Sequence, residues 1–339
     1  MKKQNSKYQQ IVDTLKQEIL NGVYPAGHRL PGQNALAARL NVSPITTKRA
    51  LNDLQAAGYI ERRSRSGSFI TERPRIFNEV NIVIGGAVEN ERLWLSSYWE
   101  GIERGAAKLG ISCQLMRPEN PAFVDRVLNG NQAQGVVLLS FENTNIMRQL
   151  KQKNIPFVVG EIEASHADYN VYINRRRIVT SLVEAMHEAG AKKIYFLGDL
   201  KQPNHFRASE GYRAAVHTYG KYPPESFDAN EDTITATLDK ILTSPEPPDG
   251  IIIAGGSLPF KALPLLLKHI PQIKLGVLTE NATVLQLQGV AFIGAFDSRE
   301  AGELTFELLY DVASGKIKTT TTFFPSYQII TPDDEKAKT

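Results

Sequence analysis

The sequence of 339 residues has little of what marks secreted, membrane or disulfide-stabilised proteins. Cys113 is its single cysteine, which excludes an intrachain disulfide framework and a cysteine-rich zinc site. No apolar run approaches the ~18 residues that a membrane span needs. The basic N-terminus leads into an amphipathic segment, and not into the apolar core of a signal peptide. We therefore expect a cytoplasmic protein that has no membrane partner.

Motifs for catalysis or nucleotide cofactors are also missing. The chain has no G-x-x-x-x-G-K-[ST], G-x-G-x-x-G, G-x-S-x-G or H-E-x-x-H pattern, and its six histidines are scattered. No residues group as a nucleophile with its base or as a set of metal ligands. We expect a protein that is not an enzyme and that binds neither a cofactor nor a metal.

The small net charge of +3 hides an uneven distribution. Residues 1–75 carry 13 Lys and Arg but five Asp and Glu, a net +8, whereas the remainder carries 26 and 31, a net −5. A basic block joined to a mildly acidic body indicates that one part of the chain binds a polyanion. At ~150 residues per domain, the length suits two or three domains.

The basic block has the pattern of three helices followed by a β-hairpin. Ser43 and Pro44 suit the N-cap and first turn of the third helix, and Gly58 suits its end. The predicted helices cover residues 8–21, 33–40 and 44–57, and the predicted strands cover residues 59–61 and 68–71. This order is that of a winged helix-turn-helix, whose third helix enters the major groove and whose hairpin contacts the DNA backbone.

The turn of that hairpin carries three arginines and no acid. By itself, such a run is as well explained as a solvated surface hairpin. Lys48 and Arg49 on the third helix, and Arg29 before the second, make DNA binding the better interpretation.

The stretch PAGHRLPGQNALAARLNVSPITTKRALNDLQAAGYIERRSRSGSFI resembles the DNA-binding domain of the GntR family of bacterial regulators. It contains P-x-G-x-x-L-P, V-S-x-x-T, A-L-x-x-L-x-x-x-G and a basic wing that ends in G-x-F. The resemblance implies operator contacts at Arg29, Asn34, Ser43, Pro44, Ile45, Thr46, Lys48, Arg49, Arg63, Arg65, Ser66 and Gly67. Pro44 and Asn34 stand where members carry arginine, Thr47 where the core is usually aliphatic, and Arg65 where the wing has its first glycine. We therefore expect the operator sequence of this protein to differ from those of other family members.

Beyond a linker centred on Arg73-Pro74-Arg75, short apolar runs alternate with helical segments. Such runs are typical of strands covered on both faces, so we predict a doubly wound parallel α/β body. The strands are predicted over residues 80–84, 112–115, 135–139, 156–159, 193–197, 250–253, 274–278 and 290–293. The helices are predicted over residues 95–109, 146–153, 178–189, 207–219, 233–242, 260–269 and 299–313.

A second resemblance concerns this body. The segment NRRRIVTSLVEAMHEAGAKKIYFLGD, followed by R-x-x-x-G-Y-R-A-A, is similar to the LacI/GalR-type effector domain, which has the periplasmic-binding-protein fold. The similarity spans nearly all of residues 80–330 and is weaker outside such islands. It implies two lobes that hold a sugar or sugar derivative between them, joined by three crossovers near Tyr172, Ala295 and Pro325.

These patterns divide the chain into domains. A winged helix-turn-helix domain covers residues 1–72, a linker residues 73–79, an effector domain residues 80–332 and a tail residues 333–339. Lobe 1 covers about residues 80–172 and 296–324, and lobe 2 about residues 173–295 and 325–332. The combination resembles arabinose-repressor-type regulators.

Ligand contacts are implied at positions that follow the strands, where open α/β sheets bind their ligands. The implied contacts are Trp94, Ser140, Glu142, Asn174, Arg207, Glu280 and Asp297. Most have a structural alternative. Trp94 could pack on a lobe surface, Arg207 could form a surface ion pair, and Asn174 and Asp297 could cap helices. Glu142 and Glu280 are more often solvated.

Ala254-Gly255-Gly256 replaces the Ala-Asn-Asp common in that family, and no tryptophan lies near Asn230, where the lactose repressor has one. Because polar groups that bind sugar hydroxyls discriminate strongly, these departures imply a ligand unlike the well-studied ones.

The two resemblances together predict a ligand-responsive transcriptional regulator, with repression the expected mode. A homodimer would place two recognition helices on a pseudo-palindromic duplex operator. One alternative is a sugar-binding protein without a regulatory role, which the attached basic domain opposes. Another is an enzyme on the same scaffold, which the missing catalytic groups oppose.

Overall fold

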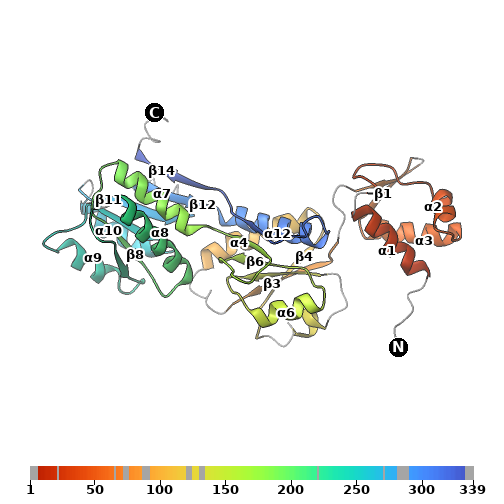
Figure 1. Ribbon diagram of the computed structural model, residues 1–339, viewed down its shortest axis with the longest axis horizontal. Coiled ribbons are helices and arrows are strands. Elements are labelled where there is room, and N and C mark those ends of the chain that lie inside the picture. Colours follow the sequence, from red (N-terminus) through yellow and green to blue (C-terminus); the bar gives the residue numbers. More distant parts are fainter. Residues whose placement is uncertain are drawn as a thin grey trace.

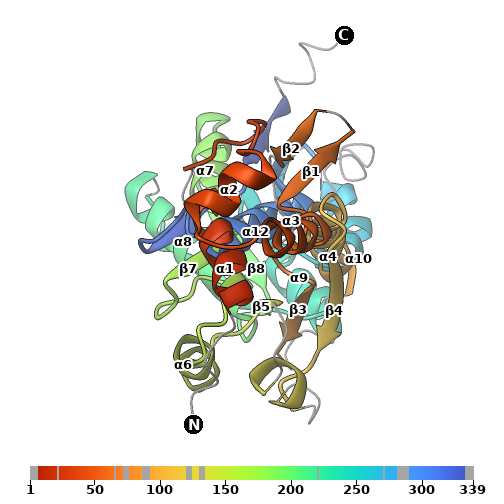
Figure 2. The same cartoon turned by 90° about the vertical axis from the view of Figure 1, so that its right-hand side faces the viewer.

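The computed structural model describes residues 7–20, 23–64, 66–71, 76–85, 92–119, 124–129, 134–219, 221–269, 272–280 and 290–332. Arg65, residues 73–75 of the linker and the tail 333–339 lie outside these ranges. A small N-terminal domain stands at one end of the molecule, and the two sheets of the body follow it along the long axis (Figure 1). Figure 2 looks from the side of the N-terminal domain, with its helices and hairpin in front.

The N-terminal domain has three helices and an antiparallel hairpin. Its elements are α1 (Lys7–Leu20), α2 (Gln33–Arg39), α3 (Pro44–Ala56), β1 (Ile60–Arg63) and β2 (Gly67–Ile70). They share a buried core to which every element contributes, among others through Leu15, Leu36, Leu54, Ile60 and Ile70. The arrangement confirms the order of elements predicted from the sequence.

Both ends of α3 are stabilised by the residues expected there. The hydroxyl of Ser43 accepts a hydrogen bond from the backbone N–H of Thr46 (3.2 Å), and Pro44 occupies the first turn. At the other end Gly58 has φ +71°, which a residue with a Cβ rarely adopts. This turn lets Gly58 N–H and Tyr59 N–H donate to the carbonyls of Gln55 and Leu54 (2.9 and 2.8 Å). Both ends of α3, including its exposed start, are therefore fixed in position.

The body contains two six-stranded sheets. The first has the order β13-β7-β6-β5-β3-β4 and the second the order β14-β12-β11-β10-β8-β9. The first consists of β3 (Glu79–Ile84), β4 (Ser112–Met116), β5 (Gln134–Leu139), β6 (Phe157–Glu161), β7 (Tyr169–Tyr172) and β13 (Thr321–Phe323). The second consists of β8 (Ile194–Gly198), β9 (Glu225–Asp228), β10 (Gly250–Ala254), β11 (Lys274–Thr279), β12 (Phe292–Phe296) and β14 (Tyr327–Ile330).

All strand pairs described in these two sheets are parallel except β12 with β14. Helices cover both faces of each sheet, which confirms the doubly wound α/β body. On the first sheet, α4 (Arg92–Ala107) and α12 (Ser298–Ala313) oppose α6 (Thr144–Gln152) and the helical segment Val124–Leu128. On the second, α7 (Arg175–Glu188) and α8 (Pro203–Tyr219) oppose α9 (Ile234–Leu242) and α10 (Leu258–Leu266), which continues into Leu267–His269.

The chain crosses from one sheet to the other in the segments that join β7 to α7, β12 to α12 and β13 to β14. Four strands had not been predicted from the sequence: β7, β9, β13 and β14. Each is three or four residues long. Strands β9, β13 and β14 have mostly half-exposed residues, and β7 has only two buried residues, of which Asn170 is polar. Such strands lack the continuous apolar run that made the buried strands visible. Within the described residues, no helix is long and apolar enough to cross a membrane.

Candidate functional site

The exposed start of α3 presents a mixed apolar and polar surface. Ile45 is 81% exposed there, and apolar side chains in this position of a recognition helix can contact thymine methyl groups. The Thr46 hydroxyl bonds to that of Ser43 (2.8 Å), whereas Thr47 is fully buried beneath them. Gln33 of α2 donates from Nε2 to the carbonyl of Pro44 (2.9 Å), which ties the two helices together at this surface.

The wing is joined to the helices by arginines. The backbone of Arg29 forms an isolated antiparallel β-bridge with that of Phe69, and Arg62 Nη1 donates to Asn52 Oδ1 of α3 (2.7 Å). Arg63 lies over the ring of Phe69, 4.5 Å from its centroid. Arg29, Arg62 and Arg63 also line a hollow of about 530 Å³ between the wing and the start of α2. A concave surface with three guanidinium groups is suited to the phosphates of a duplex backbone.

Gly67 is required at the tip of this wing. Its φ is +110°, and a Cβ there would lie 2.7 Å from Nε of Arg29. We expect Gly67→Ala to displace Arg29 and strain the turn, weakening DNA binding by about tenfold, or ~1.4 kcal/mol. The free energy of unfolding should change by less, since the wing tip lies outside the core. DNA affinity by fluorescence anisotropy and urea denaturation measure the two effects, and unchanged affinity would contradict the prediction.

A second cluster joins the two lobes. The inter-lobe cluster consists of Ser140 after β5, Glu161 at the end of β6, Arg175 at the start of α7 and Asn204 in the first turn of α8. Glu161 Oε1 accepts from Arg175 Nη2 and from Asn204 Nδ2, both at 2.7 Å, and Oε2 accepts from the Ser140 hydroxyl (3.1 Å). Glu161 is 1% exposed and Arg175 7%. A carboxylate of lobe 1 is thus bound by groups from both lobes.

The backbone of this cluster is strained. Ser140 has φ +64° and Glu161 has φ +76°, values that residues with a Cβ rarely adopt. Such conformations cost about 1–3 kcal/mol each and gather at functional sites. The guanidinium of Arg175 also lies over the ring of Phe296, 5.4 Å from its centroid, at the second crossover. The cluster therefore lies where two of the three crossovers meet.

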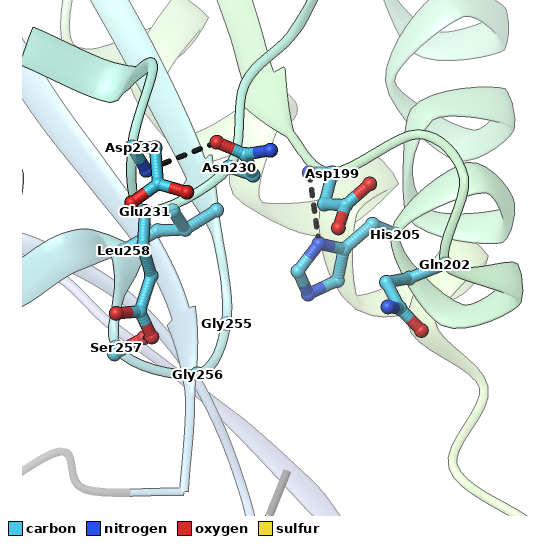
Figure 3. A pocket seen from close by; sticks show the side chains of 10 residues that line it. All are labelled: Asp199, Gln202, His205, Asn230, Glu231, Asp232, Gly255, Gly256, Ser257 and Leu258. Atoms are coloured by element: carbon cyan, nitrogen blue, oxygen red, sulfur yellow. Dashed lines mark hydrogen bonds between the residues drawn. The ribbon is translucent and has the colours of Figure 1, made fainter. Parts of the chain in front are cut away.

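Next to this cluster, lobe 2 has a polar cavity of about 350 Å³, lined by residues that follow β8, β9 and β10 (Figure 3). His205 lines it, and burial together with the charge of Arg175 lowers the pKa of its ring to about 4. Burial also raises the pKa of Glu280, which follows β11. The described residues contain no group of three or more His, Cys, Asp or Glu that could hold a metal ion. The polar side chains that line the cavity are suited to hydrogen bonding with a small polar ligand.

Residues 7–70 match the profile described as "Bacterial regulatory proteins, gntR family". They form a GntR-type DNA-binding domain. A relative in Escherichia coli (strain K12) named "Probable fructoselysine utilization operon transcriptional repressor" is 32% identical over 101 residues, 30% of this chain and 36% of that protein. The chain spans between 27% and 55% of the length of such curated relatives.

Solved structures share the fold over a much larger part of the chain. A structure described as "transcriptional regulator CelR-cellobiose complex" covers 95% of this chain and 97% of its own, with a TM-score of 0.59 and 17% identity. A sugar ABC transporter (sugar-binding protein) from Bacillus halodurans covers 77% of this chain and 99% of its own, with a TM-score of 0.62 and 13% identity. The two-lobed body therefore has the fold of LacI-type regulators and periplasmic-binding proteins.

Most residues predicted to contact DNA lie on the surface of the GntR-type domain formed by the starts of α2 and α3 and the wing. Arg49 differs, because its guanidinium lies over the ring of Tyr8, 4.5 Å from the centroid, and so faces α1. Arg65 lies outside the described residues. The DNA contacts themselves stay predictions.

The predicted ligand residues are dispersed. Ser140 belongs to the inter-lobe cluster, whereas Glu142 Oε1 and Oε2 accept from the N–H groups of His166 and Ser165 and so hold that loop. Asn174 caps α7 and Asp297 caps α12, as their structural alternatives foresaw.

Two further ligand candidates have their own surroundings. Arg207 forms ion pairs with Glu163 (3.6 Å) and Glu210 (3.2 Å), while its side chain stays 40% exposed. Trp94 lies in the first turn of α4, and not in the loop before it, and its side chain lies outside the described part. Their ligand contacts stay predictions.

Four residues of this region had not been singled out in the sequence: Glu161, Arg175, Asn204 and His205. Glu161 follows the apolar run Phe157–Val159 after one glycine, so the rule that ligands bind beyond strand ends points to it. Arg175 stands in a run of three arginines, and nothing in the sequence distinguishes it from the other two. The helix predicted from Arg207 begins at Pro203 in the structure. Asn204 and His205 therefore lie in its first turn, ahead of the predicted start.

Proposed function

We propose that this chain is a ligand-responsive transcriptional regulator. Its GntR-type domain binds operator DNA, and its two-lobed body binds a small polar ligand, a sugar or sugar derivative. The observation that carries the proposal is the presence, in one chain, of the GntR-type domain and of a LacI-type body with a polar cavity. A sugar-binding protein that does not regulate genes has no use for the basic domain.

The ligand acts by changing how the lobes contact each other. Glu161 and Arg175 belong to different lobes, so any movement of the lobes changes the contacts at the crossovers. A ligand shifts such an equilibrium only by its difference in affinity for the two arrangements. In a dimer this shift alters the spacing of the two recognition helices, and hence operator affinity.

The DNA-binding part is tested by selection from a random-sequence duplex pool, followed by gel-shift titration with the selected duplex. Sequence-preferring binding at moderate salt is expected. Its absence would refute regulation through DNA.

The contribution of the wing is tested by salt dependence. Arg63 is exposed on the wing, so Arg63→Ala should weaken binding to all duplexes alike. If Arg63 neutralises one phosphate, the slope of log K against log salt should fall in magnitude by about one. Arg104→Ala removes an exposed arginine from lobe 1 and should leave the slope unchanged. Equal slopes for Arg63→Ala and the parent would show that the wing does not contact the backbone.

A further inference from the structure

The cavity on lobe 2 combines three neighbouring loops at one edge of the sheet. Asp199 and Gln202 follow β8, Asn230 and its neighbours follow β9, and Gly255 and its neighbours follow β10. Its volume of about 350 Å³ is near the lower end for small-molecule sites. Figure 3 shows His205 and Gln202 on one side of it and Glu231 and Ser257 on the other. The cavity thus has the place and size of a site for a small ligand.

His205 offers this cavity one hydrogen-bond donor. Its side chain is 8% exposed, and its Nδ1 accepts a hydrogen bond from the backbone N–H of Asp199 (3.0 Å). Since the pKa of His205 is about 4, the ring is neutral near pH 7. With Nδ1 acting as the acceptor, the proton is on Nε2. No described residue accepts a hydrogen bond from Nε2, so this largely buried residue keeps a donor for a ligand oxygen in the cavity that it lines.

Gly255 keeps the space beside this nitrogen open. A Cβ on Gly255 would lie 3.5 Å from Nε2 of His205, so a longer side chain would cover the donor. Because position 255 is a glycine, Nε2 of His205 can be reached from the cavity that both residues line.

The remaining groups are neutral donors and charged acceptors. Asn230 Oδ1 accepts from the N–H groups of Asp232 and Thr233 (3.0 and 3.1 Å), and Figure 3 shows its amide nitrogen on the side of His205. Three carboxylates line the cavity, and Lys261 Nζ pairs with that of Glu231 (2.9 Å). Among the described lining residues there is no Lys or Arg, and nearby Arg175 is paired with Glu161. The balance of charge at the cavity is negative.

We propose that this cavity binds an uncharged polyol such as a monosaccharide, one of whose oxygens accepts a hydrogen bond from Nε2 of His205. The hydroxyls donate to the carboxylates of Asp199 and Asp232. A phosphate or carboxylate on the ligand would face the carboxylates of Asp199 and Asp232, and the described lining holds no Lys or Arg to neutralise it, since Lys261 is paired with Glu231. Phosphorylated sugars and uronates are therefore rejected. The inference rests on the proposed function, because this ligand would be the effector.

The ligand class is tested with the full chain by measuring Tm. One panel contains neutral pentoses, hexoses and disaccharides, and the other contains phosphates and uronates of the same sugars. A rise of several degrees with a neutral sugar, and none with its anionic counterparts, is expected. A rise with a phosphate or uronate overturns the inference but leaves the proposed function intact. No rise with any member of either panel overturns both.

The role of His205 is tested with the neutral sugar that gives the shift. His205→Asn retains an acceptor for Asp199 N–H but has no atom in the place of Nε2, so Kd should rise about tenfold. Gly255→Ala keeps His205, places a methyl group 3.5 Å from Nε2 and strains the loop at φ +24°, so it should also raise Kd. His217→Asn changes an exposed histidine of the same helix and should leave Kd unchanged. A role in structure alone would lower the Tm of unliganded His205→Asn and leave Kd as in the parent, which would overturn the inference.

Discussion

Arg175→Ala is expected to destabilise the body by about 3–5 kcal/mol, the cost of leaving a buried charge without its partner. Glu161 is 1% exposed and, within the described part of the chain, would keep only the neutral donors Asn204 and Ser140. At about 2–4 °C per kcal/mol for a body of this size, Tm should fall by about 10 °C. Urea denaturation followed by tryptophan fluorescence or far-UV circular dichroism measures the free energy of unfolding.

Arg207→Ala is the control for this change. Arg207 also pairs with acidic residues, but its side chain is 40% exposed, so its loss should cost no more than about 1 kcal/mol. The double variant Glu161→Gln with Arg175→Met removes both charges and should recover most of the loss. If the free energy of unfolding of Arg175→Ala were within 1 kcal/mol of that of the parent, the ion pair of Glu161 and Arg175 would not hold the lobes together as its geometry indicates.

Gly211→Ala is expected to cost about 2 kcal/mol and to disturb the cavity. Gly211 lies where α8 crosses α7, and a Cβ there would lie 2.2 Å from the carbonyl oxygen of Arg176. That oxygen belongs to the backbone, so relief requires the two helices to move apart. Overpacking of this kind costs about 1–3 kcal/mol or more, and the higher helix propensity of alanine offsets about 1 kcal/mol. Because α8 carries Asn204 and His205, ligand affinity should fall as well.

Ala214→Ser tests whether the effect comes from the crossing. It adds one heavy atom to an exposed position of the same helix and should change the free energy of unfolding by at most about 0.5 kcal/mol. Denaturation measures stability, and thermal shift with a neutral sugar measures binding. A Gly211→Ala protein as stable as Ala214→Ser would show that the helices separate without cost.

The sequence predicted the GntR-type domain almost completely, because its signals are local. Ser43, Pro44 and Gly58 fix the ends of α3 through hydrogen bonds and backbone angles within a few residues. The buried parallel strands were equally visible, since both of their faces are apolar. Short half-exposed strands such as β13 and β14 were not, because their pairing depends on partners far away in the chain.

The candidate ligand site was predicted less well, and the reason is geometric. Asn174, Asp297 and Glu142 follow strands as expected, yet their side chains bond to nearby backbone N–H groups. A residue type at a strand end cannot show whether its side chain turns inward or caps the next helix. His205 became a candidate only through its burial and its partners, whereas the strand-end rule could also have found Glu161.

The sequence by itself determined the two parts of this protein. Composition placed the charge of +8 in residues 1–75, and motifs within about 65 residues made that part a DNA-binding domain. Periodicity made the rest a doubly wound body. Only the tertiary structure decided which polar groups meet: it joined Glu161 to Arg175 across the lobes and, among the described residues, left Nε2 of His205 without an acceptor beside Gly255. Hydrogen bonds between distant segments depend on the packing of whole helices and sheets, which no local pattern encodes.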